Sequence, residues 1–207
     1  MDYSKKVAGY LLKAGAFKVS LDPLFTWTSG IKSPVYCDLR ALISDGAARD
    51  EIVAAFVEMI PLDVEVIAGT ATAGIPWAAW IAEKMKKPMI YIRSEAKEHG
   101  TKKRIEGMLL PGQKVALIED HISTGKSSIS AIAALRDEGG AIVDSVFAIN
   151  TYELSSAAEV YKAAGVKVST ITNYSVILQE SGLDSAKVEL LMDFRNDPAA
   201  WAGKHGL

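Results

Sequence analysis

Short runs of apolar, β-favouring residues recur along most of this chain and alternate with stretches of helical periodicity. Parallel strands are joined by crossovers that are usually helices, so this alternation favours a mainly parallel sheet covered on both faces. We therefore expect an α/β fold with a doubly wound, mainly parallel sheet. The predicted strands lie at 64–68, 89–93, 115–119, 143–149 and 166–172, and the predicted helices at 75–86, 127–138 and 155–164.

Both ends of the chain depart from this alternation. One short N-terminal helix is followed by a segment, 21–40, that is rich in Pro, Ser, Gly and aromatic residues. We expect residues 1–45 and 176–207 to form a small hood over the strand ends, with residues 46–175 as the core. A length of 207 residues fits a single domain of this kind, 1–207.

Charge, cysteine content and hydropathy exclude several classes of protein. The 23 basic and 25 acidic side chains leave a formal charge of −2 and form no long block of one sign, so no nucleic-acid partner is predicted. The single cysteine cannot form an intrachain disulfide, which fits the cytoplasm. The most apolar stretch, 52–68, is interrupted by charged residues and proline and falls short of the ~20 apolar residues of a membrane helix. We expect a cytoplasmic protein with no membrane partner.

The segment from Lys114 to Ser128 runs from an apolar strand through two carboxylates, Glu119 and Asp120, into a loop of small and hydroxyl residues. Backbone N–H groups where a strand meets the next helix form a receptor for phosphate. Two carboxylates would repel a bare phosphate and are better suited to sugar hydroxyls or a divalent cation. The alternative is a solvated turn whose acids favour the helix dipole. With the hydroxyl-rich loop, the order predicts a sugar-phosphate site.

Two stretches imitate a nucleotide-binding P-loop without matching it. Gly125-Lys126-Ser127 has the right ending, but the pattern requires glycine at position 120, where this chain has an aspartate. In 69–76 the glycine spacing is right, but Ile75 and Pro76 stand where Lys and Ser or Thr belong. A P-loop kinase is therefore excluded.

The strand-Glu-Asp-x-x-Ser-Thr-Gly order resembles the ribose-phosphate signature of the type I phosphoribosyltransferases, which use 5-phosphoribosyl 1-diphosphate (PRPP). Stretches 29–40, 69–76 and 91–100 are similar, in order and spacing, to bacterial orotate phosphoribosyltransferases. The resemblance spans about residues 10–180 and implies the type I phosphoribosyltransferase fold. It also implies transfer of ribose 5-phosphate from PRPP to orotate, giving orotidine 5′-monophosphate and diphosphate in de novo UMP synthesis.

The same resemblance implies a homodimer with shared active sites, and Mg²⁺ held mainly by the diphosphate rather than by protein ligands. Orotate would be contacted by Ser123, Lys32, Tyr36 and Cys37. The residues implied for PRPP are Arg93, Lys97, His99, Glu119, Asp120, His121, Ile122, Ser123, Thr124, Gly125, Lys126 and Ser127.

The polar segment 95–107 is crowded with basic side chains, so its composition predicts an exposed, mobile loop. Such a loop is either plain solvated surface or a lid that folds over a diphosphate and stabilises the leaving group. The resemblance supports the second interpretation, with Arg93, Lys97 and His99 reaching the neighbouring subunit's site. Lys97 and Asp120 are the expected catalytic residues.

This chain departs from the family pattern at two positions. Thr28 stands where a PRPP-binding lysine often precedes the Ser-Gly pair, and Lys32 is the expected substitute. Tyr152 stands where some members have an arginine for the orotate carboxylate, which leaves backbone N–H groups, Ser123 or another cation for that task. His121 lies inside the phosphate signature, where we expect a structural role. Trp27 is expected in the core or an interface.

Two alternative functions are compatible with the ribose-phosphate signature. A phosphoribosyltransferase for a neutral or purine base would keep the signature and differ only in its base preference. A non-catalytic regulator on the same fold would bind RNA, and it should display a basic face that this balanced composition does not predict.

Overall fold

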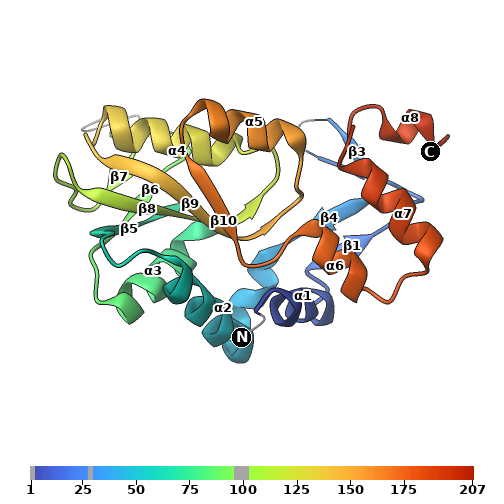
Figure 1. The fold of residues 1–207 in the computed structure, drawn as a ribbon, viewed down its shortest axis with the longest axis horizontal. Coiled ribbons are helices and arrows are strands. Elements are labelled where there is room, and N and C mark those ends of the chain that lie inside the picture. The colour runs from blue at the N-terminus through green and yellow to red at the C-terminus, as the bar shows by residue number, and fades with distance from the viewer. Residues whose placement is uncertain (1–2, 28–29, 96–102) are drawn as a thin grey trace.

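The structure, a computed structural model, describes residues 3–27, 30–95 and 103–207. A six-stranded sheet crosses its centre in the order β10-β9-β8-β5-β6-β7 (Figure 1). The first five are parallel and β7 is an antiparallel edge strand paired with β6. The strands are β5 (Val66–Thr70), β6 (Met89–Ile92), β7 (Ile105–Glu106), β8 (Lys114–Ile122), β9 (Ile142–Thr151) and β10 (Lys167–Thr170).

Helices cover both faces of this sheet (Figure 1). In the view of that figure, α4 (Lys126–Asp137) and α5 (Ser155–Ala163) lie above the strands, whereas α2 (Gly46–Met59) and α3 (Gly74–Met85) lie below them. The predicted α/β class and mainly parallel sheet are therefore confirmed. Among the helices of the described ranges, none is long and apolar enough to cross a membrane.

The order of the strands reverses between β5 and β8, because the chain passes from β5 to β6 on one side and from β8 to β9 on the other. In open α/β sheets, ligands bind at the carboxyl ends of the strands that flank such a reversal. Strand β8 is long enough to carry Glu119, Asp120 and His121 to this edge of the sheet.

The prediction of a mobile loop over 95–107 is wrong for its last part. Ile105 and Glu106 form β7, in register with Ile92 and Tyr91 of β6. Arg104 hydrogen-bonds the backbone of Arg93 and is half-buried. Composition could not show this, because it does not report hydrogen bonds. Backbone hydrogen bonds to a neighbouring strand hold a polar segment in place just as apolar packing would.

The segments before α2 and after β10 lie together beside the sheet (Figure 1). The N-terminal segment contains α1 (Tyr3–Lys13), the pair β1 (Phe17–Val19) and β4 (Val35–Cys37), the pair β2 (Phe25–Thr26) and β3 (Lys32–Ser33), and the 3₁₀ helix η1 (Leu39–Ser44). The C-terminal segment contains α6 (Tyr174–Glu180), α7 (Ser185–Phe194) and α8 (Trp201–Lys204), and α1 packs against α6. The division into a hood and a core stays a prediction.

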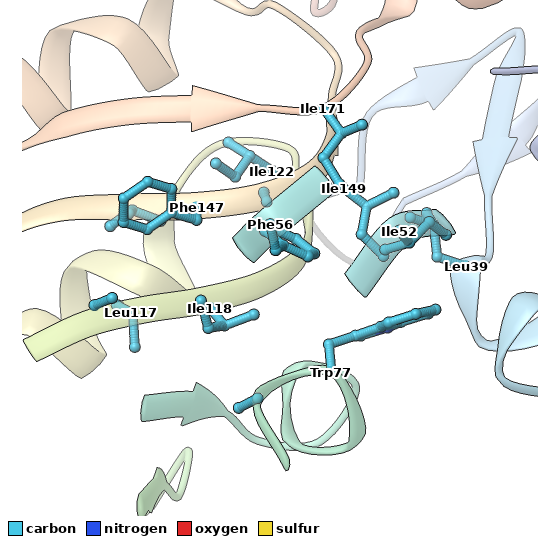
Figure 2. Close-up of a cluster of buried hydrophobic side chains, with 14 of the residues drawn as sticks. Leu39, Ile52, Phe56, Trp77, Leu117, Ile118, Ile122, Phe147, Ile149 and Ile171 are labelled. Atoms are coloured by element: carbon cyan, nitrogen blue, oxygen red, sulfur yellow. The ribbon is translucent and has the colours of Figure 1, made fainter. Parts of the chain in front are cut away.

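Large apolar side chains of the core meet between the sheet and the lower helices (Figure 2). Phe56 of α2 and Trp77 of α3 are completely buried beside Ile118 of β8. Trp77 is thus a core residue. Trp80 sits edge-on against it with ring centroids 5.2 Å apart.

Two glycines allow α3 to begin directly against the sheet. A Cβ on Gly74 would lie 2.6 Å from the carbonyl oxygen of Ile118, and a Cβ on Gly69 would lie 2.9 Å from the carbonyl oxygen of Gly74. Both distances are well below van der Waals contact. The glycine spacing that imitates a P-loop therefore serves close packing of α3 on β5 and β8.

We expect Gly74→Ala to destabilise the fold by about 1–3 kcal/mol, because the new methyl group must push α3 away from β8. Gly9→Ala is the matched control, since Gly9 lies in α1 with open space around its Cβ position. That control should stabilise the chain by about 0.5–1 kcal/mol, since alanine favours a helix over glycine. Urea unfolding measures both, and equal stability of Gly74→Ala and the parent chain would contradict the packing argument.

Candidate active site

A cleft of about 680 Å³ opens at the carboxyl end of β8. One wall is the loop from β8 into α4, and the other consists of aromatic and small residues from the N-terminal segment and the end of β9. The lining residues are Thr26, Trp27, Tyr36, Cys37, His121, Ile122, Ser123, Thr124, Gly125, Lys126, Ser127, Ser128 and Tyr152.

The loop 123–127 has the local geometry of an anion receptor. Gly125 caps α4 in the left-handed conformation, with φ at 78°, and a Cβ there would lie 3.0 Å from the ring of Tyr161. Glycine also brings no side-chain acceptor to the first-turn N–H groups of α4, so these remain available to a ligand. Hydroxyls of Ser123, Thr124 and Ser127 border the same cleft and add donors.

Glu119 lies under this loop with only 4% of its surface exposed. Its Oε1 accepts hydrogen bonds from the hydroxyls of Ser127 and Ser128, both at 2.9 Å. Burial raises the pKa of this carboxyl to about 7, and the charge of neighbouring Asp120 adds to the effect. A buried carboxyl therefore fixes the start of α4 from below.

Asp120 is half-buried on the opposite side of the strand. Burial raises its pKa, whereas backbone hydrogen bonds and the charge of Arg40 oppose that rise. The Arg40 guanidinium is itself paired with Asp38 through bonds of 2.6 and 2.8 Å. Asp120 thus faces a locally neutral ion pair at the edge of the site.

The other end of the cleft is aromatic. Trp27 is stacked on Tyr152 with ring centroids 4.9 Å apart and an angle of 13° between the planes. The edge contact between His121 and Tyr152 has a centroid distance of 4.2 Å. The indole Nε1 of Trp27 donates to the carbonyl of Val35 at 3.2 Å, which fixes the ring. These contacts form a rigid wall.

Neutral polar groups complete that wall. The Nδ2 of Asn150, a fully buried residue, lies 3.2 Å from Nδ1 of His121 and 3.7 Å from the sulfur of Cys37. Burial lowers the pKa of His121 to about 3 and raises the pKa of the Cys37 thiol to about 12. Both side chains are uncharged near neutral pH, and the Asn150 donor places the imidazole proton on Nε2.

The residues predicted for the site are distributed unevenly. Residues 121–127 line the cleft with Tyr36 and Cys37, whereas Glu119 lies beneath it. Lys32 contacts the lining through Thr26, to whose hydroxyl its Nζ donates at 2.9 Å. Arg93 follows β6, with Nη1 3.7 Å from Oε1 of Glu106. Lys97 and His99 lie outside the described residues, as does Thr28.

Sequence patterns missed three residues of the lining, Thr26, Trp27 and Ser128, whereas the family resemblance already puts Tyr152 at the position of an orotate-binding arginine. Trp27 was expected in the core or an interface, yet its half-buried ring borders the cleft. Tyr152 carried a signal, because it follows directly on a parallel strand that ends beside the phosphate loop. Nothing in its own residue type distinguished it from a core aromatic.

The buried carboxyl of Glu119 should make stability depend on pH. Its pKa rises from 4.5 to about 7, so between these values the folded chain keeps a proton that the unfolded chain has lost. Stability is then fully present below the unfolded pKa and falls as pH rises through the folded pKa, by up to about 3 kcal/mol.

We expect Glu119→Gln to remove this fall, because the amide oxygen still accepts from both serines but cannot ionise. Urea unfolding across about pH 5 to pH 8 measures the effect. Glu159→Gln, at an exposed position of α5, is the control and should keep the parent profile. A Glu119→Gln profile that falls as steeply as the parent's would show that another group is responsible.

Comparisons with known proteins agree with the geometry. A family model for the phosphoribosyl transferase domain matches residues 47–185. An orotate phosphoribosyltransferase of Lactococcus lactis subsp. cremoris is 44% identical and covers 97% of this chain and 99% of its own length. One of Streptococcus gordonii is 45% identical, again over 97% of this chain and 99% of the relative.

Solved structures give the same result. A crystal structure of orotate phosphoribosyltransferase from Aeropyrum pernix superimposes with a TM-score of 0.75 at 31% identity, covering 85% of this chain and 98% of that one. The structure of Leishmania donovani UMP synthase gives a TM-score of 0.76 at 26% identity, covering 91% of this chain and 42% of that chain. With the loop 123–127 at the switch point of its sheet, the chain belongs to the orotate phosphoribosyltransferase family of type I phosphoribosyltransferases.

Proposed function

We propose that the chain transfers the ribose 5-phosphate group of PRPP to orotate, giving orotidine 5′-monophosphate and diphosphate for UMP synthesis. One observation carries this beyond family membership: a single cleft joins an anion receptor, 123–127, to an uncharged aromatic wall. A pyrimidine nucleotide has the matching shape, with a phosphate at one end of a ribose and a flat base at the other. Family membership and relatives of nearly full length support the same assignment.

For PRPP, the first turn of α4 and the hydroxyls of Ser123, Thr124 and Ser127 are the proposed ligands of the 5′-phosphate, with Lys126 adding a positive charge. Asp120 is the proposed ligand of the ribose hydroxyls. Glu119 joins it only when Ser127 and Ser128 release its Oε1, since both hydroxyls now donate to that oxygen. His121 and Ile122 shape the cleft beside the sugar.

For the leaving diphosphate, the proposed ligands are Arg93, Lys97 and His99. Lys97 acts mainly in the transition state, where negative charge accumulates on the departing group. Among the described residues, no group of three His, Cys, Asp or Glu side chains could hold a metal ion. We propose that Mg²⁺ arrives on the diphosphate of PRPP, as the family resemblance implies, where it would supply charge neutralisation.

For orotate, the proposed ligands are Tyr36, Cys37 and Ser123, which line the cleft, and Lys32, whose Nζ donates to the lining residue Thr26. Orotate already carries delocalised negative charge, so the reaction needs little general-base assistance. The harder task is to stabilise an oxocarbenium-like ribosyl centre, a problem shared with glycoside hydrolysis. Ribose and phosphate held in line by the loop and Asp120 serve that task.

Three further features belong to this proposal. The enzyme is a homodimer in which Arg93, Lys97 and His99 reach the neighbouring subunit's site, as the family resemblance implies. The segments 1–45 and 176–207 act as a hood over the cleft. A cytoplasmic location fits the lone thiol of Cys37.

The first test is the loss of orotate absorbance on addition of PRPP and Mg²⁺, with uracil and hypoxanthine as parallel bases. We expect turnover with orotate alone and strict dependence on PRPP. Turnover with hypoxanthine or uracil instead would replace the proposed base. PRPP binding without turnover of any base would favour a regulator, and RNA binding would then be measured.

Shared active sites predict recovery of activity in mixed dimers. Asp120→Ala damages the ribose site, and Lys97→Ala damages the loop that serves the other subunit. Each variant alone should be nearly inactive, whereas hybrids should regain about one intact site in two, or roughly a quarter of parental activity in an equal mixture. Absence of recovery despite demonstrated subunit exchange would show that each site is built from one chain.

A further inference from the structure

Arg104 joins the start of β7 to the end of β6, and its side chain replaces one of the usual backbone donors. The Arg93 N–H donates to the carbonyl of Arg104 at 3.0 Å, as an antiparallel ladder requires. The reciprocal donor, the N–H of Arg104, bonds Oε2 of Glu138 at 3.0 Å instead. The guanidinium Nε of Arg104 supplies the missing ladder bond to the Arg93 carbonyl at 2.9 Å. Both polar backbone groups of Arg93 therefore depend on one residue.

The same guanidinium attaches this hairpin to α4. Its Nη1 donates to the backbone carbonyl of Ser130 at 3.0 Å and to the Ser130 hydroxyl at 2.9 Å. Ser130 and Glu138 are about two helical turns apart, so Arg104 holds the helix at two separate points. A planar fork of donors can join carbonyls in two elements at once, which a lysine ammonium cannot reproduce.

These bonds tie the backbone of Arg93, a proposed diphosphate ligand for the neighbouring subunit's site, to the helix that follows the phosphate loop of its own chain. Arg93 is the proposed diphosphate ligand that follows β6, and the first turn of α4 belongs to the loop that borders the cleft. We propose that Arg104 is a positioning residue for PRPP, which holds the backbone of Arg93 in a fixed place against α4, from which the Arg93 side chain reaches the neighbouring subunit's site. This inference rests on the proposed function, because it takes Arg93 as a ligand of PRPP.

The competing explanation is that Arg104 only stabilises the fold. Arg136 provides a matched comparison on the same helix, since its guanidinium donates to the backbone carbonyls of Ala164 and Val143. Those bonds tie α4 to β9 and to the end of α5, away from the lining of the cleft. Loss of either arginine removes hydrogen bonds to two backbone segments. Of the two arginines, Arg104 is the one that contacts Arg93.

The experiment measures PRPP affinity by titration calorimetry in the presence of Mg²⁺, so it does not depend on which base the enzyme accepts. We expect Arg104→Ala to weaken PRPP binding about tenfold and Arg104→Lys to weaken it less, since lysine reaches one carbonyl only. Arg136→Ala should lower the melting temperature and leave PRPP affinity within about twofold. Phosphate affinity should change little in every variant, because the phosphate loop itself is intact.

A double-mutant cycle separates positioning from general damage. In the Arg93→Ala background, Arg104→Ala should cause no further loss of PRPP affinity, because the residue it positions is gone. The inference would be overturned if Arg104→Ala lowered PRPP affinity by the same factor with and without Arg93→Ala. It would also be overturned if Arg104→Ala and Arg136→Ala lowered PRPP affinity equally. If Arg104→Ala fails to fold, the Arg104→Lys cycle gives the same comparison. Failure of the proposed function is a different result, seen in the parent chain as absence of orotate turnover.

Discussion

The pairing of β8 between β5 and β9 is the constraint on which the rest of the molecule depends. Both neighbours are parallel to it, so their carboxyl ends reach the same edge of the sheet. The strand order reverses beside β8, and in open α/β sheets ligands bind at the carboxyl ends of the strands that flank such a reversal. A strand of this length places Glu119 and Asp120 on opposite sides of the backbone, one beneath the loop and one beside it.

Electrostatics divide the cleft into two unlike halves. The loop half offers N–H groups and hydroxyls at a helix N-terminus, which favour negative charge. The aromatic half contains His121 and Cys37 in uncharged forms, because burial disfavours their ions. Under the proposed function, an orotate anion in that half would be bound by directed hydrogen bonds, with Lys32, whose Nζ donates to Thr26, as the proposed cation.

Sequence periodicity was sufficient to locate the five parallel strands, because each contains a run of apolar, β-favouring residues, although β10 is not buried and β6 is followed by β7 rather than by a helix. It missed α2, whose apolar residues merge with the approach to β5 into one long hydrophobic stretch. The two carboxylates were found from their place after a strand, yet the bonds from Ser127 and Ser128 to Glu119 depend on how the loop folds back. The stack of Trp27 on Tyr152 joins segments far apart in the chain, which no local pattern reports.

The bonds to Glu119 also affect how the phosphate loop can bind its ligand. Ser127 gives its only hydroxyl proton to a carboxylate, so a phosphate at the loop must take that proton away from Glu119 or use the Ser127 oxygen as an acceptor. An ionised phosphate has no proton to offer, so the first course applies and Glu119 loses a donor. A pKa near 7 allows the carboxyl to take up a proton in exchange. The loop 123–127 and Glu119 beneath it are therefore coupled. The free energy gained from hydrogen bonds to a phosphate is partly offset by the loss of a hydrogen bond to Glu119 and by the uptake of a proton there.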